Sequence, residues 1–308
     1  MGGADSPRAC KCGGAGMPCG LCNTGDEPAL LPGFRVTIDA KDGPALAWII
    51  NQRSRAMTTD VDLIRSDFDF GPEAFGLGDI LWRDAAGDDV VWLMNNNTPT
   101  TIATLPFVSP EWHVKATADF DGFFSINAQS DILWQNDNGS LALWQMHGTT
   151  VRAIHVLPNP APTWHVVGDN DFHFDESYNV LFQNDNGALA IWTGISAGTG
   201  TVSGMFAGTQ NPGPSWHVVG TGDTNADGKA GVLWQNNNGA LALWEDPTFG
   251  AGTFTFNTVA ALPTVDPSWH VKGMASIRGN NLANDIVFQN DNGAVAIWEM
   301  AAGRRLPP

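Results

Sequence analysis

Residues 132–144 read ILWQNDNGSLALW, and nearly the same stretch recurs at three further places in the chain. It returns as VLFQNDNGALAIW at 180–192, VLWQNNNGALALW at 232–244 and IVFQNDNGAVAIW at 286–298. Repetition at a fixed period is the signature of architectures that stack one supersecondary unit many times. The stretch therefore forms a structural element, a repeated binding site, or both.

The tryptophans mark the repeat, because all 13 of them fall into three columns spaced by about 50 residues. The first column belongs to a WHV tripeptide, the second precedes the QNDNG turn, and the third ends the apolar run after it. The columns are Trp112, Trp164, Trp216, Trp269; Trp82, Trp134, Phe182, Trp234, Phe288; and Trp48, Trp92, Trp144, Trp192, Trp244, Trp298. We interpret them as core, in preference to a sugar-stacking platform.

Each unit reads as four short strands. WHVVG forms strand one, and a polar, acidic loop leads to strand two, DILWQ. Asn-Gly accepts the positive φ angles of a tight hairpin, so NDNG reverses the chain into strand three, LALWQ. Strand four is variable, as in 151–157 and 254–262, and a Pro-rich connector follows it. Strands two and three are nearly continuous apolar runs, which indicates burial on both faces.

These units predict an all-β fold, a β-propeller of four-stranded blades, with a β-sandwich as the alternative. The third column has six members, so we expect six blades, with five or seven as alternatives. The unit that would come first in the chain is irregular, because 35–48 aligns with strands two and three but follows no WHV. The last unit leaves little room for a fourth strand. The predicted domains are a Cys-rich segment, 1–33, and the propeller, 34–308.

The charge composition limits the classes of partner that the protein is expected to bind. The formal net charge is −17, with 32 acidic against 15 basic residues. Nucleic acid and anionic membrane surfaces need a basic patch, so we expect neither as a partner. No apolar run approaches the roughly 18–20 residues of a membrane span, and no signal peptide is visible at the N-terminus. A soluble protein that acts outside the cell or at its surface fits this composition.

The unit WHVVGTGDTNADGKAGVLWQNNNGALALW (216–244) resembles the FG-GAP/VCBS repeat family. That family includes the propeller of integrin α chains, fungal propeller lectins and many secreted bacterial repeat proteins. The resemblance covers roughly 35–300 and implies the propeller fold. It also implies that the loop between strands one and two can hold calcium through the pattern D-x-[DN]-x-DG-x-x-D.

The best match to this pattern is DTNADGKAG, with Asp223, Asn225 and Asp227 as candidate calcium ligands. Oxygen ligands at alternate positions converge on one cation, and Gly228 allows the sharp turn. The ninth position is Gly231, so one expected ligand is missing. The alternative is a solvated turn in which Asp and Asn bond their own backbone. The equivalent loops at 67–79, 119–131 and 171–179 depart further from the pattern.

All four cysteines lie near the N-terminus, as C-x-C-x6-C-x2-C. They are Cys10, Cys12, Cys19 and Cys22. Four thiolates among glycine-rich turns can surround a structural zinc ion. Two local disulfides are the alternative, favoured if the protein is secreted.

The polar residues of the repeat are the candidate ligand contacts. For the WHV histidines, His113, His165, His217 and His270, we expect hydrogen bonds between blades rather than ligand binding. Asn and Gly of the hairpin follow from turn chemistry, whereas Gln does not, and Asn, Asp and Gln suit sugar hydroxyls. The candidate carbohydrate contacts are Gln135, Asn136, Asp137, Gln183, Asn184, Asp185, Gln235, Asn236, Gln289, Asn290 and Asp291.

No catalytic motif stands outside the repeat, so we predict no catalytic residues. The sequence favours a non-enzymatic recognition protein that binds carbohydrate or a glycoprotein surface multivalently, as a lectin or adhesion propeller does. One alternative is a docking subunit of a larger extracellular or toxin-type assembly, attached through its Cys-rich N-terminus. A glycan-active enzyme is a more distant alternative.

Overall fold

The computed structural model describes residues 61–68, 79–95, 98–120, 129–174, 177–275, 284–301 and 304–305. These residues form β-strands joined by turns and loops. Among them there is no helix that could cross a membrane. The predicted Cys-rich segment, the boundary at 33/34 and the irregular repeat at 35–48 lie outside the described residues.

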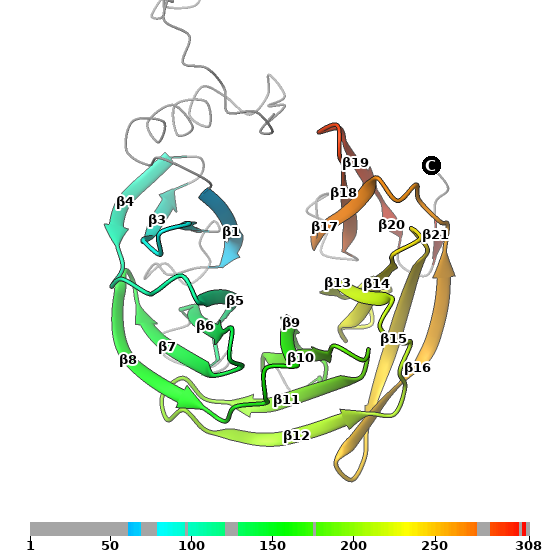
Figure 1. Cartoon of the computed structure of the whole chain (residues 1–308), viewed down its shortest axis with the longest axis horizontal. Helices are drawn as coiled ribbons and strands as arrows, with labels where there is room; N and C mark the ends of the chain where they lie inside the picture. The colour runs from blue at the N-terminus through cyan, green and yellow to red at the C-terminus, as the bar shows by residue number, and fades with distance from the viewer. Residues whose placement is uncertain are drawn as a thin grey trace, which may run out of the picture. The chain divides into compact units, whose positions relative to one another are not determined.

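The described strands form five blades, numbered here in chain order (Figure 1). The first blade comprises β1 (Val61–Phe68), β2 (Asp79–Asp84), β3 (Asp89–Asn95) and β4 (Thr98–Thr104). The second comprises β5 (Trp112–Ala118), β6 (Asp131–Asn136), β7 (Leu141–His147) and β8 (Thr150–Leu157). The third comprises β9 (Trp164–Asn170), β10 (Asn179–Asn184), β11 (Leu189–Ile195) and β12 (Val202–Gly208).

The fourth blade comprises β13 (Trp216–Gly222), β14 (Gly231–Asn236), β15 (Leu241–Phe249) and β16 (Thr253–Leu262). The fifth has three described strands, β17 (Trp269–Ala275), β18 (Asp285–Asn290) and β19 (Val295–Trp298). A short hairpin of β20 (Met300–Ala301) and β21 (Arg304–Arg305) follows. Consecutive strands of each blade pair antiparallel.

This arrangement confirms the predicted β-propeller. Strand one of each described blade lies on the inner side of the arc, and β4, β8, β12 and β16 lie on the outer side (Figure 1). Strands two and three form the predicted hairpin, in which the Gly139 amide donates to the Asn136 carbonyl at 2.8 Å. The outer strands of the third and fourth blades also pair with each other, in parallel, at Ala207 and Thr253. The total of six blades stays a prediction, because 35–48 is not described.

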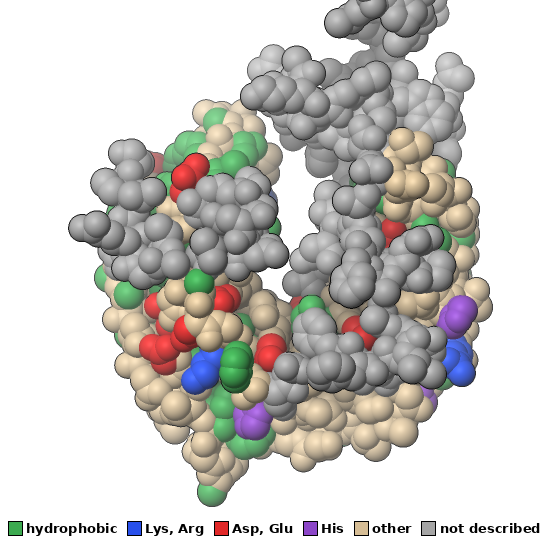
Figure 2. Space-filling view, turned by 180° about the vertical axis from the view of Figure 1, so that it is seen from behind, with side chains coloured by type: hydrophobic (Ala, Val, Ile, Leu, Met, Phe, Trp, Pro, Cys, Tyr) green, Lys and Arg blue, Asp and Glu red, His purple; other side chains and the backbone are tan. Residues whose placement is uncertain are grey.

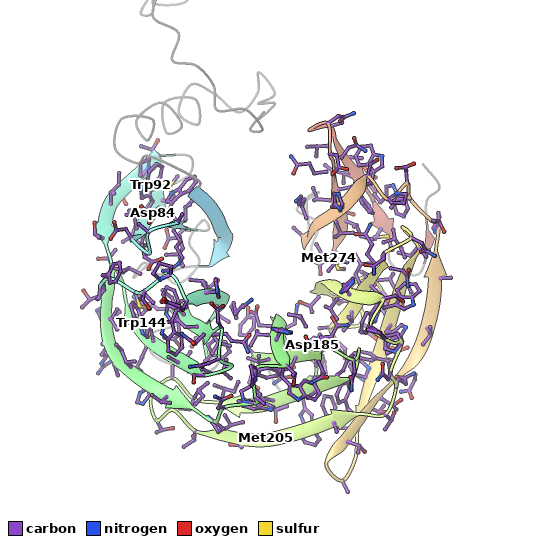
Figure 3. The ribbon with its side chains drawn as sticks, viewed as in Figure 1. Asp84, Trp92, Trp144, Asp185, Met205 and Met274 are labelled. Atoms are coloured by element: carbon purple, nitrogen blue, oxygen red, sulfur yellow. The ribbon has the colours of Figure 1, made fainter. Side chains whose placement is uncertain are left out.

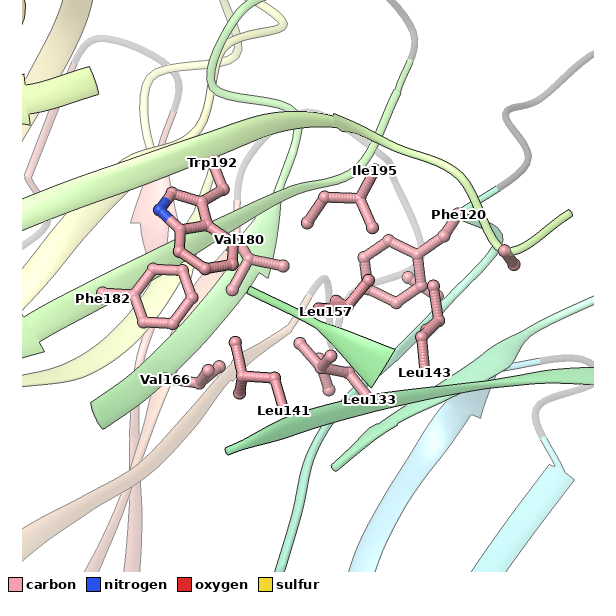
Figure 4. Close-up of a cluster of buried hydrophobic side chains, with 13 residues drawn as sticks. Phe120, Leu133, Leu141, Leu143, Leu157, Val166, Val180, Phe182, Trp192 and Ile195 are labelled. Carbon is pink, nitrogen blue, oxygen red and sulfur yellow. The ribbon is translucent and has the colours of Figure 1, made fainter. Parts of the chain in front are cut away.

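The second, third and fourth blades each have two different buried faces, which we call the aromatic face and the leucine face. In the second blade, the aromatic face packs against the first blade. Its residues are Ile132, Trp134, Ala142 and Trp144. The leucine face packs against the third blade, as Figure 4 shows for its close-packed side chains. Its residues are Leu133, Leu141, Leu143 and Leu157.

The same pairing of faces recurs between the described blades. The leucine face of the third blade meets the aromatic face of the fourth, and that of the fourth meets the fifth. Full burial of one such side chain stabilises the fold by about 1.5–3 kcal/mol relative to exposure. Blade order is therefore held by hydrophobic burial between sheets.

The tryptophans of columns two and three are mostly core, as predicted. Trp134 and Trp234 are 1% and 0% exposed, although their indole N–H groups have no hydrogen-bond partner among the described residues. Phe182 occupies the same position in the third blade and is equally buried. The column therefore supplies ring volume to the core rather than a polar contact. The WHV tryptophans are half-buried.

The hairpin glycine is required for two separate reasons. Gly139 has φ +86°, a left-handed conformation that L-residues with a Cβ rarely adopt. A Cβ at Gly139 would also lie 2.5 Å from the carbonyl carbon of Ala161, in the connector to the third blade. The turn thus needs glycine both for its own shape and for the close approach of the connector.

Candidate functional site

The hairpin glutamines join neighbouring blades. Gln183, which is 8% exposed, donates from Nε2 to the Trp216 carbonyl at 2.6 Å and accepts from the Val218 amide at 3.0 Å. Gln135 makes the same pair of bonds to Trp164 and Val166, at 2.7 and 2.9 Å. Gln235 makes them to Trp269 and Val271, at 2.7 and 3.3 Å. We call this arrangement the glutamine clip.

The first blade uses Arg83 at the clip position. Its guanidinium donates to the carbonyl oxygens of Val108, Ser109 and Trp112 at 2.9–3.0 Å. It also pairs with the buried Asp89 carboxylate at 2.6 Å. Burial raises the pKa of Asp89 to about 6, against the opposing effect of Arg83. The residue at this position therefore has a long side chain that donates hydrogen bonds to the next blade, either the amide of glutamine or the guanidinium of arginine.

These contacts give the clip glutamines an architectural role that accounts for their recurrence. The structure places Gln135, Gln183 and Gln235 at blade-to-blade contacts. The side-chain amide of Gln289 in the fifth blade hydrogen-bonds to no described residue, although its backbone pairs with β17 and β19. The candidate ligand contacts that remain exposed lie one and two residues further along the hairpin.

Histidine and aspartate pair on the exposed rim of the second, third and fifth blades. His165 Nε2 lies 2.7 Å from Asp185 Oδ1, and the two side chains are 49% and 62% exposed. The same pair forms in the second and fifth blades, at 2.8 Å each; the residues are His113 with Asp137 and His270 with Asp291. In the fourth blade, His217 pairs with Asn237 at 2.8 Å.

The histidine prediction needs correction. We expected hydrogen bonds between blades, whereas each histidine bonds to the hairpin of its own blade. The reason is register: strand one runs antiparallel to strand two, with His165 opposite Gln183, next to the hairpin. The contact between blades falls instead to the backbone of Trp216 and Val218 in the next unit.

A groove of about 280 Å³ lies between the third and fourth blades at this rim. The polar lining comes from the third-blade hairpin and from both histidines; it comprises His165, Gln183, Asn184, Asp185 and His217. Apolar surface is supplied by Val167, Pro214 and Val218. The groove therefore combines hydrogen-bonding groups with a small apolar wall. Figure 3 labels Asp185 on the inner part of the arc.

Asparagine of the hairpin is occupied by the turn. Asn184 donates to the Thr163 hydroxyl at 3.1 Å, and its side-chain oxygen accepts from the Asn186 amide at 3.2 Å. The corresponding side-chain donors of Asn236 and Asn290 reach Ser215 and Ser268. Asn136 caps the turn in the same way, through the Asn138 amide. Turn chemistry thus explains asparagine, as the sequence indicated.

The equivalent rim positions of the second blade carry an additional cation. Lys115 stands where the third blade has Val167, at the bulge after WHV. Burial lowers the pKa of Lys115, and the nearby Asp137 opposes that change. The repeated positions are therefore similar in shape but differ in charge.

The predicted calcium loop is closed by its own hydrogen bonds. The Asp223 carboxylate accepts from the backbone amides of Ala226 and Gly228 at 2.6 and 2.9 Å. Asn225 and Asp227 accept from amides two residues ahead. No group of three or more His, Cys, Asp or Glu side chains is placed to hold a metal within the described part of the chain. Calcium at this loop stays a prediction.

The sequence did not indicate that the aspartate at the start of strand two is buried and hydrogen-bonds to the backbone of its own blade. Asp131 is 2% exposed and accepts from the backbone amides of Met146 and Phe120, at 2.9 and 3.2 Å. Asp79 accepts from the Met94 amide of β3 at 2.7 Å, and Asp285 accepts from the Met300 amide of β20 at 2.9 Å. The signal available in the sequence was an acidic residue directly before an apolar run.

In the fourth blade, a different pair of residues takes the place of this aspartate. Gly231 occupies the aspartate position, and a Cβ there would lie 3.1 Å from Cγ of Glu245. Glu245 accepts a hydrogen bond from the Thr224 hydroxyl, and burial raises the pKa of its carboxyl. A glutamate from strand three thus stands where an aspartate from strand two stands in the first, second and fifth blades.

The zinc or disulfide prediction for Cys10, Cys12, Cys19 and Cys22 lies outside the described residues and stays a prediction. On the described surface, acidic side chains are visible in several patches and basic ones are few (Figure 2). This distribution agrees with the formal net charge of −17.

Comparison with known proteins identifies similar folds. No protein-family model matches the chain, and no curated protein matches it. Among solved structures, the WD40 β-propeller domain of Doa1 matches with a TM-score of 0.40 and 13% identity, over 75% of this chain and 64% of that one.

Two structures of BBS1N in complex with ARL6DN also match. One has a TM-score of 0.43 and 13% identity, over 80% of each chain. The other has a TM-score of 0.36 and 14% identity, over 73% of this chain and 61% of that one. This chain thus spans less than two thirds of the Doa1 chain and of one BBS1N chain. Likeness at this identity concerns the fold alone.

Proposed function

We propose that the protein is a non-enzymatic, multivalent recognition protein that binds carbohydrate at the rim between its blades. The observation that carries this proposal is the exposed histidine–aspartate or histidine–asparagine pair, which four blades repeat at the same position. In the groove between the third and fourth blades, this pair borders the histidine of the next blade.

The groove chemistry suits a polyhydroxylated ligand. A carboxylate accepts hydrogen bonds from sugar hydroxyls, and an imidazole nitrogen donates or accepts according to its tautomer. The apolar wall of Val167, Pro214 and Val218 offers contact to the C–H face of a pyranose ring. A volume of about 280 Å³ is just below the range of small-molecule pockets and suits a single sugar residue.

Repetition supports multivalency. One small, exposed groove provides few contacts, so its affinity for a monosaccharide should be weak. Similar sites on consecutive blades engage a branched glycan or a glycosylated surface together, and the second contact is then effectively intramolecular. The protein should therefore prefer clustered or repeated glycans to free monosaccharides.

A glycan array with the full chain tests this function. A variant with all four rim histidines replaced by alanine should lose at least tenfold in apparent affinity for the glycans bound; the histidines are His113, His165, His217 and His270. The control is Met205→Ala, on outer strand β12 away from the rim, which should leave binding unchanged (Figure 3). Silence of the wild-type protein across a broad array would overturn the proposal.

A docking function is the second candidate, favoured by apolar side chains on the outer strands. Ile154 and Val156 of β8 are 57% and 80% exposed, and Ile102, Met205 and Val259 are exposed on β4, β12 and β16. Exposed apolar surface of this kind is typical of protein contacts. Under this function, co-purification with a protein partner should be lost in Val156→Asp and retained in the variant that lacks the rim histidines.

A further inference from the structure

The groove between the third and fourth blades has a close counterpart between the second and third blades. All but one of the residues that line the groove are repeated there by an identical residue at the equivalent position. The exception is the residue after the WHV tripeptide, which is Val167 in the groove and Lys115 in the counterpart. We call the counterpart, together with Lys115, the lysine site. Its other residues are His113, Gln135, Asn136, Asp137, Pro162, His165 and Val166.

The lysine site and the groove share one backbone framework. Gln135 makes both hydrogen bonds of the glutamine clip, at 2.7 and 2.9 Å. A Cβ at Gly139 would lie 2.5 Å from the carbonyl carbon of Ala161 in the connector. One at Gly187 would lie at the same 2.5 Å from the carbonyl carbon of Gly213. Ala161 and Gly213 both have positive φ, +81° and +90°, so the two connectors turn in the same way.

Lys115 is a cation without a partner in the described part of the chain. Its side chain is only partly exposed, and its ammonium group forms no hydrogen bond or ion pair with a described residue. The charge of Asp137 favours the ammonium, but the carboxylate itself hydrogen-bonds to His113 at 2.8 Å. Burying a charge without a partner is unfavourable, and burial accordingly lowers the pKa of Lys115. A ligand that carries a negative charge supplies the missing partner.

The other described WHV repeats lack a partly buried cation at this position. Val167 and Val219 stand there in the third and fourth blades, and the fourth blade also has Asn237 in place of the rim aspartate. The fifth blade has Lys272, whose side chain is exposed, so that water solvates its ammonium. Similar sites along the rim thus offer different charges to a ligand.

The overall charge of the protein does not favour an anionic ligand. A formal net charge of −17 repels anions at long range, so a preference for them has to come from local pairing with a cation. A sugar carboxylate suits this pairing, because an ammonium binds it by charge-assisted hydrogen bonds. The hydroxyls of the same sugar then bond to Asp137 and His113.

We propose that the lysine site selects sugars that carry a carboxylate, and that Lys115 pairs with this carboxylate. The inference rests on the proposed carbohydrate function and assigns different sugars to different sites. The lysine site takes an acidic sugar, whereas the groove lined by Val167 takes a neutral one. The protein should therefore bind best to glycans that present acidic and neutral sugars together.

A glycan array of matched pairs tests this selectivity with the full chain. The members of each pair differ only in a carboxylate: glucuronic acid against glucose, galacturonic acid against galactose, and N-acetylneuraminic acid against its carboxyl-reduced form. Wild type should prefer the acidic member of at least one pair by about fivefold, the effect of one partly exposed ion pair. Lys115→Val, which introduces the residue of the third blade, should remove this preference, and Lys115→Arg should retain it.

Lys272→Val is the matched control for the loss of one positive charge, and the preference should survive in it. Equal binding of acidic and neutral members by the wild type would overturn the proposal. So would a preference that persists in Lys115→Val, or one that Lys272→Val removes to the same extent. Failure of the carbohydrate function itself looks different, because the wild type would then bind no member of any pair, and this inference would fall with it.

A second variant covers the case in which Lys115→Val does not fold. Val167→Lys adds an ammonium to the groove on the same framework and should raise the preference for the acidic member by at least twofold. Thermal unfolding of each variant confirms that it is folded before the array is read. An unchanged preference in folded Val167→Lys would contradict the role given to lysine at this position.

Discussion

The seam between two blades and the rim beside it come from the same few residues but have opposite surroundings. Gln183 is 8% exposed, and its amide bonds to the next blade. Two residues further on, the Asp185 side chain is 62% exposed and pairs with His165 of its own blade. The glutamine therefore belongs to the packing between blades, whereas the aspartate belongs to the surface that a ligand can reach.

Removal of the clip should have the largest effect on stability. Gln183→Ala leaves the Trp216 carbonyl and the Val218 amide without their partner, which should lower the free energy of unfolding by about 1–3 kcal/mol. Urea unfolding measures this change. The matched control is Gln289→Ala, which should cost less than about 0.5 kcal/mol because that amide bonds to no described residue. Equal losses in both variants would break the distinction between a clipped and an unclipped blade.

The Arg83 version of the clip should make stability depend on pH. The pKa of Asp89 is about 6 in the folded protein against an ordinary value of 3.8, so the folded state binds this proton more tightly. Its contribution to the free energy of unfolding therefore decreases as the pH rises from about 4 to about 6. Between pH 5 and pH 7 the loss should be about 1 kcal/mol.

Asp89→Asn removes this titration. The difference in free energy of unfolding between wild type and variant, measured in urea at pH 5 and pH 7, should change by about 1 kcal/mol. A difference that is the same at both pH values would show that burial does not shift this carboxyl. Asp185→Asn, at the exposed rim, is the matched control for a general effect of losing a carboxylate.

The rim should have the smallest effect on stability. Asp185→Ala removes an exposed pair with His165, and such pairs contribute about 0–1 kcal/mol. Thermal unfolding should therefore change little, while glycan binding at this groove weakens. A loss of stability as large as that of Gln183→Ala would show that the rim pair is architectural and would blur the distinction from the seam.

Much of the fold could be predicted from the sequence. The alternation of apolar runs, Asn-Gly turns and proline connectors located strands two and three of the second and third blades to within about two residues. This works because hairpin chemistry and hydrophobic burial depend on short stretches of chain. The tryptophan columns likewise identified core positions such as Trp134 and Trp234.

The roles of the polar residues could not be read in the same way. His165 and Gln183 lie opposite each other in the register, yet one bonds within the blade and the other to the next blade. A signal for the histidine pairing was present, since an Asp or Asn stands at the same hairpin position in every WHV repeat. Nothing local distinguished its partner, because the partner lies about 20 residues away along the chain.

The sequence by itself determined the repeat, the strands, the hairpins and the propeller class, because each depends on local conformation and on the period of apolar residues. Only the tertiary structure decided which face of a blade meets the next, that glutamine closes the seam, and that histidine and aspartate remain exposed. These properties depend on how one sheet packs against another, and a repeated stretch reads the same whether its neighbour is present or not. The fifth blade shows this: IVFQNDNGAVAIW matches the other copies, and yet Val295 and Ile297 are exposed where Leu141 and Leu143 are buried.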